Sequence, residues 1–483
     1  MTDILPPLSA ALADRLRGPV VGPDDASYDD SRAVYNGMID KRPGLIAYCT
    51  DEADVIAAIE FAHEHDLLVA VRGGGHNGGG LGTCDDGLVI DLSRMRGVRY
   101  DPESETVRVQ GGCTWADVDH ATHAYGRAVP SGIISTTGVG GLTLGGGLGN
   151  ITRKCGLTID NLIEADVVTA SGERLTASAS SHPDLYWALR GGGGNFGVVT
   201  SFLFKTHPVD TIVGGPTLFP LDRAKEIMQW YREFIVDAPE DLNGWFAFMT
   251  VPPVAPFPEE LHLQKVCGVL WCYAGPEEEA DAVFAPVRAL EPILYGIHAM
   301  PFPGLQSAFD ALYPKGHQWY WKAAFFNELT DAAIDEHITY ARALPTPQST
   351  MHLYPVNGAA HRVDKHDTAW SYRDALWGQV IVGVDPDPAK KDDLIRWARD
   401  YHEALHPYSA GGAYVNMMMD EGEERVKASY RDNYDRLARI KAQYDPQNFF
   451  QVNQNIRPMA ADGRSRPAAT RPDDDAGPRA FAT

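Results

Sequence analysis

Several features that would point to particular classes of protein are missing from this chain of 483 residues. No run of about 18 apolar residues occurs, so we expect no membrane-spanning helix. The first residues, MTDILPPLSAALADRLRGPV, lack the basic and then apolar pattern of a secretory signal. The six cysteines are scattered, with no CxxC pair and no zinc spacing. We therefore expect reduced thiols, no metal site and a cytoplasmic location.

Basic residues are also few. The 42 Lys and Arg are outnumbered by 65 Asp and Glu, which gives a net charge of −23. Such acidity disfavours nucleic acids and anionic membranes as partners. The hydrophobic fraction of 44% is ordinary for a soluble protein, and the length predicts two or three domains. None of these quantities predicts the oligomeric state.

Glycine, by contrast, is abundant and unevenly distributed. The 47 glycines are densest between Gly73 and Gly197, where four clusters stand out, at 73–80, 111–113, 138–150 and 191–197. The first, within VRGGGHNGGG, follows an apolar run, which predicts a strand that leads into a rigid turn. Glycine loses more backbone entropy on folding than any other residue. Six glycines in one turn therefore indicate a need for φ > 0 or for close approach of backbone N–H groups to a ligand, often a phosphate.

The clusters match no common nucleotide motif. GGGLGN and GGGGNFG partly mimic the dinucleotide fingerprint, but neither has the preceding strand, the following helix and the later acid together. No GK[ST] follows a glycine run, so the chain has no P-loop. Hairpin turns would explain one cluster but not four. We therefore expect several backbone loops to converge on one extended ligand that carries phosphates.

Hydrophobic periodicity predicts both helices and strands. The segments 51–66 and 114–126 are typical of amphipathic helices, and 421–444 indicates a longer one. The predicted strands are 87–92 and 106–110, and they are followed by a hairpin at 165–178.

Four longer motifs occur in a fixed order: RGGGHNGGG, PSGIISTTGVGGLTLGGGLGNITRKCGLTIDNL, DLYWALRGGGGNFGVVTSF and YDPQNFFQVNQNIRP. Together they resemble the berberine-bridge-enzyme-like FAD-linked oxidases, which belong to the vanillyl-alcohol-oxidase (PCMH-type) flavoproteins. The resemblance extends along nearly the whole chain up to Pro458.

This resemblance implies an α+β fold with a two-subdomain PCMH-type FAD-binding domain at 1–209, whose core spans about 40–209. A substrate-binding domain would follow at 210–410, with an antiparallel sheet covered by helices. The segment 411–458 would return to the FAD domain. We expect 459–483, which is rich in Pro, Ala, Asp and Arg, to be disordered.

The resemblance also implies that His76 bonds covalently to the 8α carbon of FAD. Many relatives have a second bond from a cysteine, but Ile134 stands at that place here, so we expect a single link. We interpret Cys155 as a buried apolar residue. Thr137 stands where side-chain bulk gates oxygen access in the family, and its small size permits oxidase behaviour. The other cofactor contacts implied by the motifs are Arg72, Gly73, Gly74, Gly75, Asn77, Gly78, Ser131, Gly138, Gly141, Gly145, Ile159, Asn161, Val198, Asn453 and Asn455.

The reaction implied is hydride transfer from a carbinol, or from a C–H beside a heteroatom, to flavin N5. An alcohol must also lose its hydroxyl proton to a base within hydrogen-bond reach. Tyr414 is our candidate, because relatives carry a Y-x-N motif and this chain reads GGAYVNMMMD. On an extended strand Asn416 would share the face of Tyr414 and could orient it or the substrate. The alternative is a core tyrosine with a satisfied hydroxyl.

Two further segments are candidate walls of the site. In WYWK (319–322), Tyr320 and Lys322 would share one face of a strand, and Lys322 could lower the pKa of a phenol. A half-buried strand with an exposed lysine explains this pattern equally well. Gln379 is the nearest match to an acid or amide that faces the flavin in plant relatives, although a slip of one residue would reverse its face. A glutamine there would favour simple alcohol or sugar oxidation.

The sequence thus predicts an enzyme, an FAD-linked oxidase that produces hydrogen peroxide from molecular oxygen. Its small-molecule substrate would be a sugar, an oligosaccharide or a hydroxyl-bearing secondary metabolite. A flavin-dependent dehydrogenase with another electron acceptor and a non-catalytic flavin-binding protein are the alternatives.

Overall fold

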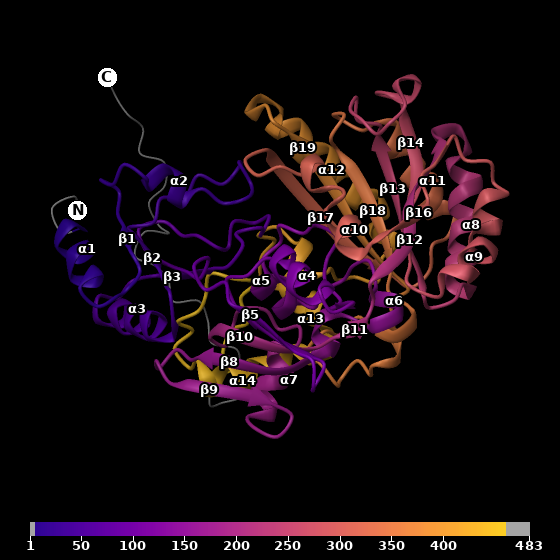
Figure 1. Ribbon diagram of the computed structural model, residues 1–483. Coiled ribbons are helices and arrows are strands. Elements are labelled where there is room, and N and C mark those ends of the chain that lie inside the picture. Colours follow the sequence, from indigo (N-terminus) through magenta and orange to yellow (C-terminus); the bar gives the residue numbers. More distant parts are fainter. Residues whose placement is uncertain (1–4, 460–483) are drawn as a thin grey trace, which may run out of the picture.

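The structure, a computed structural model, describes residues 5–459 (Figure 1). Beyond Met459, the segment predicted to be disordered lies outside the described residues. Helices and sheets are mixed in an α+β fold, as expected, and the principal sheets of the described part are three. No helix within residues 5–459 is long and apolar enough to cross a membrane.

The first sheet carries the first glycine cluster. Its strand order is β1-β2-β4-β3, in which β4 pairs in parallel with both β2 and β3. Helix α3 begins at Asp51, whose carboxylate accepts a hydrogen bond from the Asp54 amide and so caps the helix. The elements are α1 (Leu5–Ala13), β1 (Val20–Val21), α2 (Tyr28–Arg32), β2 (Leu45–Tyr48), α3 (Glu52–Glu64), β3 (Val69–Arg72) and β4 (Leu88–Asp91).

The second sheet is antiparallel, with the order β5-β6-β10-β8-β9. It contains the predicted strand at 106–110 and the predicted hairpin. Helix α4 begins at Thr114 with a capping box completed by Asp117. The elements are β5 (Val98–Asp101), β6 (Thr106–Gln110), α4 (Trp115–His123), β7 (Arg127–Ala128), α5 (Val139–Gly145), α6 (Thr152–Cys155), β8 (Leu162–Val168), β9 (Arg174–Ser178), α7 (Pro183–Leu189), β10 (Val198–Lys205) and β11 (His207–Pro208).

The third sheet follows in the order β15-β12-β14-β13-β18-β19-β17, with β16 beside β12. Helices α8, α9, α11 and α12 cover its outer face, and the opposite face is turned toward the first two sheets (Figure 1). The elements are β12 (Thr211–Pro220), α8 (Ala224–Asp237), β13 (Leu242–Thr250), β14 (Lys265–Tyr273), α9 (Ala280–Arg288), β15 (Leu294–Tyr295), β16 (His298–Pro301), α10 (Phe302–Ser307), β17 (Gln318–Phe326), α11 (Asp331–Arg342), β18 (Thr350–Pro355), β19 (Trp377–Asp385) and α12 (Lys391–Leu405).

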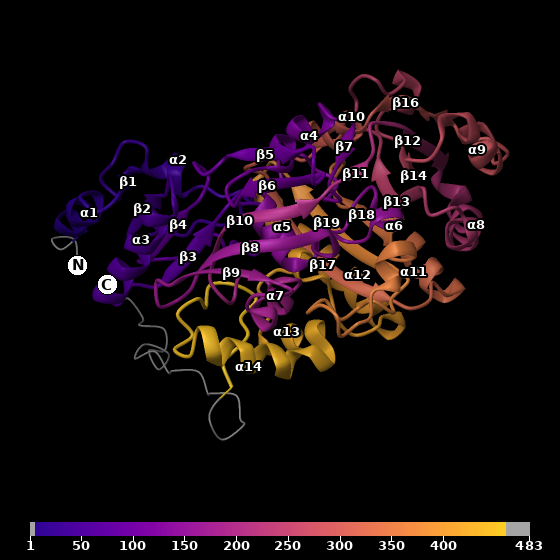
Figure 2. The ribbon, with the colours of Figure 1, turned by 60° about the horizontal axis from the view of Figure 1, so that its bottom comes forward.

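The C-terminal segment lies against the second sheet, beside α7 (Figure 2). The single helix expected over 421–444 is two helices, α13 (Glu423–Tyr430) and α14 (Tyr434–Tyr444). Arg431 between them has φ 45°, a left-handed conformation that ends a regular helix. The boundaries near 210 and 411 stay predictions.

A buried ion pair fastens this segment to the fourth glycine cluster. Lys441 Nζ donates to Asp445 Oδ2 at 2.6 Å, to Asn195 O at 2.6 Å and to Phe450 O at 2.9 Å. The Asp445 carboxylate also accepts hydrogen bonds from the Phe449 and Phe450 amides. Burial lowers the pKa of Lys441 to about 8, although Asp445 opposes this shift. The two charges therefore satisfy each other inside the protein.

Replacing Lys441→Met should lower the free energy of unfolding by about 3–5 kcal/mol, because it leaves the Asp445 carboxylate buried without its cation. Lys427→Met is the control, since Lys427 pairs with Glu423 on a half-exposed surface and should contribute less than about 1 kcal/mol. Urea unfolding of both variants measures the difference. Equal effects would contradict the role given to the buried pair.

Candidate active site

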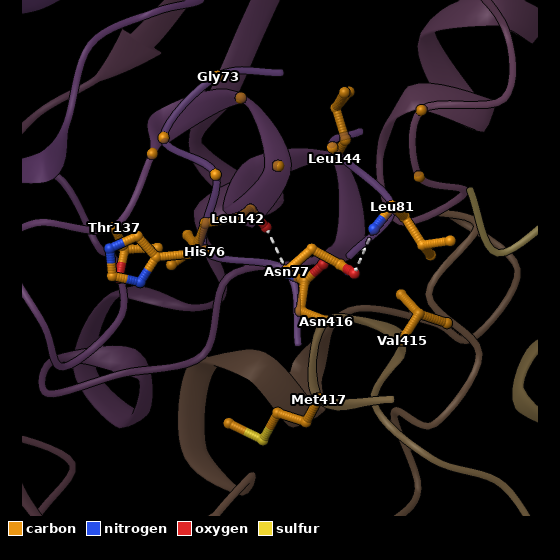
Figure 3. A pocket seen from close by; sticks show the side chains of 18 of the residues that line it. Gly73, His76, Asn77, Leu81, Thr137, Leu142, Leu144, Val415, Asn416 and Met417 are labelled. Atoms are coloured by element: carbon orange, nitrogen blue, oxygen red, sulfur yellow. Dashed lines mark hydrogen bonds between the residues drawn. The ribbon is translucent and has the colours of Figure 1, made fainter. Parts of the chain in front are cut away.

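A cleft lies where the glycine clusters of the first two sheets meet the third sheet and the C-terminal segment. All four clusters contribute to its lining, as expected for loops that converge on one extended ligand. Strands β17, β18 and β19 supply one wall, and residues after α14 supply another. Figure 3 shows the part of the cleft around His76 and Asn416.

The loop after β3 presents unused hydrogen-bond donors. Among residues 5–459, no acceptor receives a hydrogen bond from the backbone N–H groups of 73–77. The Nη1 atom of buried Arg72 also has no partner there, although its Nε binds Asp91 Oδ2 at 2.5 Å and its Nη2 binds Ser31 O. Residues 73–77 are half-buried or exposed, so their free N–H groups are accessible from the cleft, and Arg72 adds a buried guanidinium beside them. This arrangement of donors is suited to an anion such as a diphosphate.

Glycine is required here for close approach. A Cβ atom on Gly74 would lie 2.5 Å from the Gly138 nitrogen, and one on Gly78 would lie 2.7 Å from the Trp321 ring. A Cβ on Gly141 or Gly194, however, would meet no protein atom within 4 Å, and both residues line the cleft. The first two glycines thus bring protein segments together, and the last two leave space for a ligand.

His76 is the fourth residue of this loop, which runs from the end of β3 at Arg72 to the start of β4 at Leu88. Its ring stacks on Tyr35 with centroids 4.2 Å apart, and its Nε2 lies 3.1 Å from Thr136 Oγ1. Desolvation in the cleft lowers the pKa of His76 to about 4, so the imidazole is neutral at physiological pH. A neutral imidazole keeps one nitrogen lone pair available for bonding. Figure 3 shows His76 beside Thr137, which also lines the cleft.

The cysteines contribute nothing to the lining. All six are buried free thiols, and Ile134 occupies the cleft wall at the position where relatives carry a cysteine. Cys155 packs in an apolar cluster with Leu157, and burial raises the pKa of its thiol to about 12. A thiol that stays protonated is a poor nucleophile.

Tyr414 and Asn416 both line the cleft, but they do not belong to a strand as expected. A short 3₁₀ helix, Val415–Met417, follows Tyr414 and turns Asn416 back toward it. Asn416 Nδ2 donates to Leu142 O at 2.9 Å (Figure 3) and to the Tyr414 hydroxyl at 2.8 Å. The Gly147 amide donates to the same hydroxyl at 2.7 Å. Burial raises the pKa of Tyr414 to about 12, and the two hydrogen bonds oppose this shift.

Lys322 and Gln379 do not reach the cleft, which corrects both expectations. Lys322 pairs with Glu421 at 2.6 Å, and the hydroxyl of Tyr320 accepts a hydrogen bond from Arg399 on α12. Trp319 and Trp321, on the opposite face of β17, line the cleft instead. The cross-strand partners of Gln379 are Ala324 and Leu353, which belong to the helix-covered core, so Gln379 faces that core. Its neighbour Val380 faces the cleft. The register differs by one residue, which reverses the face.

The remaining residues implied by the motifs divide into two groups. Those that line the cleft are Arg72, Gly73, Gly74, Gly75, His76, Asn77, Thr137, Gly138, Gly141 and Asn453. Those outside its lining are Gly78, Ser131, Gly145, Ile159, Asn161, Val198 and Asn455. Several of the second group position the lining: Gly145, for example, allows Asn416 to approach, since a Cβ there would lie 2.1 Å from Asn416 Oδ1. The contacts of all these residues with a cofactor stay predictions.

Sequence reasoning missed an aromatic and histidine group on the third-sheet side: Tyr35, Tyr313, His352 and Tyr354. The alternation of His352 and Tyr354 in MHLYP was a usable signal, because residues two apart share a strand face. Nothing in the sequence near Tyr313 indicated that its side chain would join them.

Comparisons with known proteins agree with this geometry. Residues 43–178 match a family model described as an FAD binding domain, and residues 413–457 match one described as berberine and berberine like. An FAD-linked oxidoreductase of Dictyostelium discoideum is 32% identical over 422 residues, which cover 86% of this chain and 89% of that protein. The (R)-6-hydroxynicotine oxidase of Paenarthrobacter nicotinovorans is 28% identical over 475 residues, covering 93% and 99%.

A solved structure, the xylooligosaccharide oxidase of Myceliophthora thermophila in complex with xylobiose, has the same fold. Its TM-score is 0.81 at 24% identity, with coverage of 94% of this chain and 99% of that one. The chain therefore belongs to the FAD-linked oxidoreductases of the berberine-bridge-like family, and it is an enzyme. The resemblance seen in the four motifs is confirmed.

Gly141→Ala should weaken the binding of FAD without disturbing the apoprotein, because the new methyl group would project only into the cleft. We expect a loss of about 1–3 kcal/mol in binding free energy, as when a methyl group is forced into a packed site. The matched control is Gly304→Ala in α10, where a Cβ also meets nothing within 4 Å but no cleft is present. FAD titration of both variants in a His76→Ala background measures non-covalent affinity. Equal affinities would show that FAD does not approach Gly141.

Proposed function

We propose that this FAD-linked oxidoreductase is an oxidase that removes hydride from a carbinol of a small molecule and passes the electrons to molecular oxygen, forming hydrogen peroxide. The observation that carries the proposal is the position of Tyr414, whose hydroxyl shares the cleft with His76 and accepts two hydrogen bonds. FAD, when bound, supplies the two-electron acceptor at flavin N5. Residues of the chain must hold the cofactor and accept the hydroxyl proton of the carbinol.

The covalent attachment of FAD is assigned to His76. The neutral imidazole, held by Tyr35 and Thr136, would supply the nitrogen lone pair of a link to the 8α carbon. Such a link would replace one C–H bond of the 8α methyl group, with loss of a proton and of two electrons that molecular oxygen would accept. The absence of a cysteine from the cleft lining supports a single link. A tether holds the flavin in place and raises its reduction potential, which favours acceptance of hydride.

Tyr414 is assigned the role of base for the hydroxyl proton of the carbinol. The amide of Gly147 and the side chain of Asn416 both donate to its oxygen, so they stabilise the phenolate relative to the phenol. No strong carboxylate lines the cleft within the described residues, which is compatible with simple alcohol oxidation. The small Thr137 beside His76 supports access of oxygen, and the six free thiols support a cytoplasmic location.

The tether is tested by acid precipitation of the purified yellow protein. Flavin absorbance should remain in the pellet, and the mass of the protein should exceed that of the chain by one FAD. His76→Ala should instead release its flavin into the supernatant, while His120→Ala, on the exposed side of α4, should keep it. Yellow colour that washes off the unmodified protein would remove the covalent link but keep the FAD enzyme.

The base is tested by the pH dependence of flavin reduction by a substrate alcohol. Because the pKa of Tyr414 is raised to about 12, kcat/KM should increase with pH as the phenolate fraction grows. Tyr414→Phe should abolish this increase and lower kcat by about 10²–10⁴-fold. Asn416→Ala removes a donor that favours the phenolate and should therefore shift the increase to higher pH.

The control for these variants is Tyr231→Phe, which removes a buried hydroxyl from the helix-covered face of the third sheet. An unchanged pH profile in Tyr414→Phe would exclude Tyr414 as the base. Comparing turnover on oxygen with turnover on an artificial dye separates the oxidase from a dehydrogenase, since only an oxidase forms hydrogen peroxide at a comparable rate.

A further inference from the structure

A chain of three neutral side chains lies in the cleft wall formed by the third sheet. His352 Nε2 lies 3.1 Å from the hydroxyl of Tyr313, and its Nδ1 lies 2.8 Å from the hydroxyl of Tyr354. All three residues line the cleft. Trp245 packs against the imidazole with ring centroids 4.5 Å apart, which fixes the ring between the two tyrosines. We call this group the Tyr–His–Tyr chain.

The chemistry of a neutral imidazole determines what this chain offers to a ligand. Burial lowers the pKa of His352 to about 3, so one ring nitrogen carries hydrogen and the other does not. One tyrosine therefore donates its O–H hydrogen bond to the imidazole and keeps its oxygen lone pairs free, while the other accepts a hydrogen bond from the imidazole and keeps its O–H free. The chain thus presents a free O–H donor at one tyrosine and a free acceptor at the other, on opposite sides of the imidazole. The free O–H can donate to the oxygen of an alcohol, which leaves the hydrogen of that alcohol for the candidate base Tyr414. Exchange of the tautomer only exchanges the two tyrosines.

The rest of this wall carries no charge. Its other members are Trp319, Trp321, Val380 and Val382, and none of the described lining residues is Asp, Glu or Lys. The only permanently charged lining residue in that set is Arg72, which belongs to the first sheet and is paired with Asp91. A cation or an anion bound against the third sheet would therefore lose its water without gaining a counter-charge.

From these observations we propose that the substrate is a neutral, largely apolar or aromatic alcohol whose hydroxyl is held by the Tyr–His–Tyr chain. The inference rests on the proposed function, since it names the substrate class of that site. Trp319 and Trp321 supply flat apolar surface for the body of the substrate. An oligosaccharide would bring many hydroxyls to a wall with few polar partners, and an amine or a carboxylate would bring an unpaired charge. His352 is a positioning residue, because it acts through the two tyrosine hydroxyls.

The substrate class is tested on the holoenzyme with four probes: benzyl alcohol, its para-aminomethyl and para-carboxyl derivatives, and xylobiose. Without oxygen, the rate of flavin bleaching at increasing probe concentration gives the dissociation constant of a probe that is oxidised, and the perturbation of the flavin spectrum gives that of a probe that is not. Benzyl alcohol should bind at least about tenfold more tightly than each of the others, a difference of about 1.4 kcal/mol. Tighter binding of a charged probe or of xylobiose would overturn the proposal, and so would the absence of any spectral change with benzyl alcohol.

The role of His352 is tested by comparing an alcohol with its hydrocarbon. His352→Phe should weaken the binding of benzyl alcohol about tenfold and leave that of toluene within about twofold. His337→Phe is the matched control, because His337 is also buried and bonded to a tyrosine, Tyr401, but lies on the helix-covered side. Equal losses for the two ligands, or no loss, would overturn the role. Failure of the proposed function is distinguishable, because it would appear as a protein without flavin or as a flavin that none of the four probes reduces, whereas failure of the substrate class leaves a flavin that another probe reduces.

Discussion

The contact between two glycine loops is the constraint on which the cleft depends. A Cβ atom on Gly138 would lie 2.4 Å from the Gly74 nitrogen, so neither position accepts a side chain without separating the loops. This contact joins the first sheet to the second and fixes the start of α5. From α5, the carbonyl of Leu142 holds Asn416, and Asn416 holds the hydroxyl of Tyr414. A single backbone contact thus aligns the His76 loop with the candidate base.

The C-terminal segment completes the site because a buried ion pair holds it there. Lys441 and Asp445 connect the end of α14 to the fourth glycine cluster and to the backbone of Phe450. A buried charge is costly unless it is paired and fully hydrogen-bonded, and here both partners are. This arrangement explains why residues far from the FAD-binding domain in the sequence, such as Asn453, line its cleft.

Neutrality is the third property of the cleft. His76 and His352 are both desolvated enough that the pKa of each lies well below the usual value, and the tyrosines that face them stay protonated at physiological pH. The polar groups that line the third-sheet side of the cleft are therefore hydroxyls and an imidazole rather than ions, and Arg72 on the first-sheet side is the charged residue of the described lining. Specificity in such a site comes from the direction of hydrogen bonds, which is fixed by the packing of Trp245 and the three-sheet framework.

The sequence by itself determined the family and the convergence of the four glycine clusters on one cleft. Glycine is readable in this way because close backbone approach and φ > 0 both exclude larger residues, whatever the surrounding fold. The sequence also located His76 and the helices α3 and α4, whose caps are local. It did not determine which face of β17 or β19 meets the cleft: alternation makes Gln379 and Val380 point in opposite directions, but only the packing of helices on one side decides which is which. The turn at Val415–Met417 and the meeting of Tyr313 with His352 likewise required the tertiary structure, because each depends on contacts between residues distant in the chain.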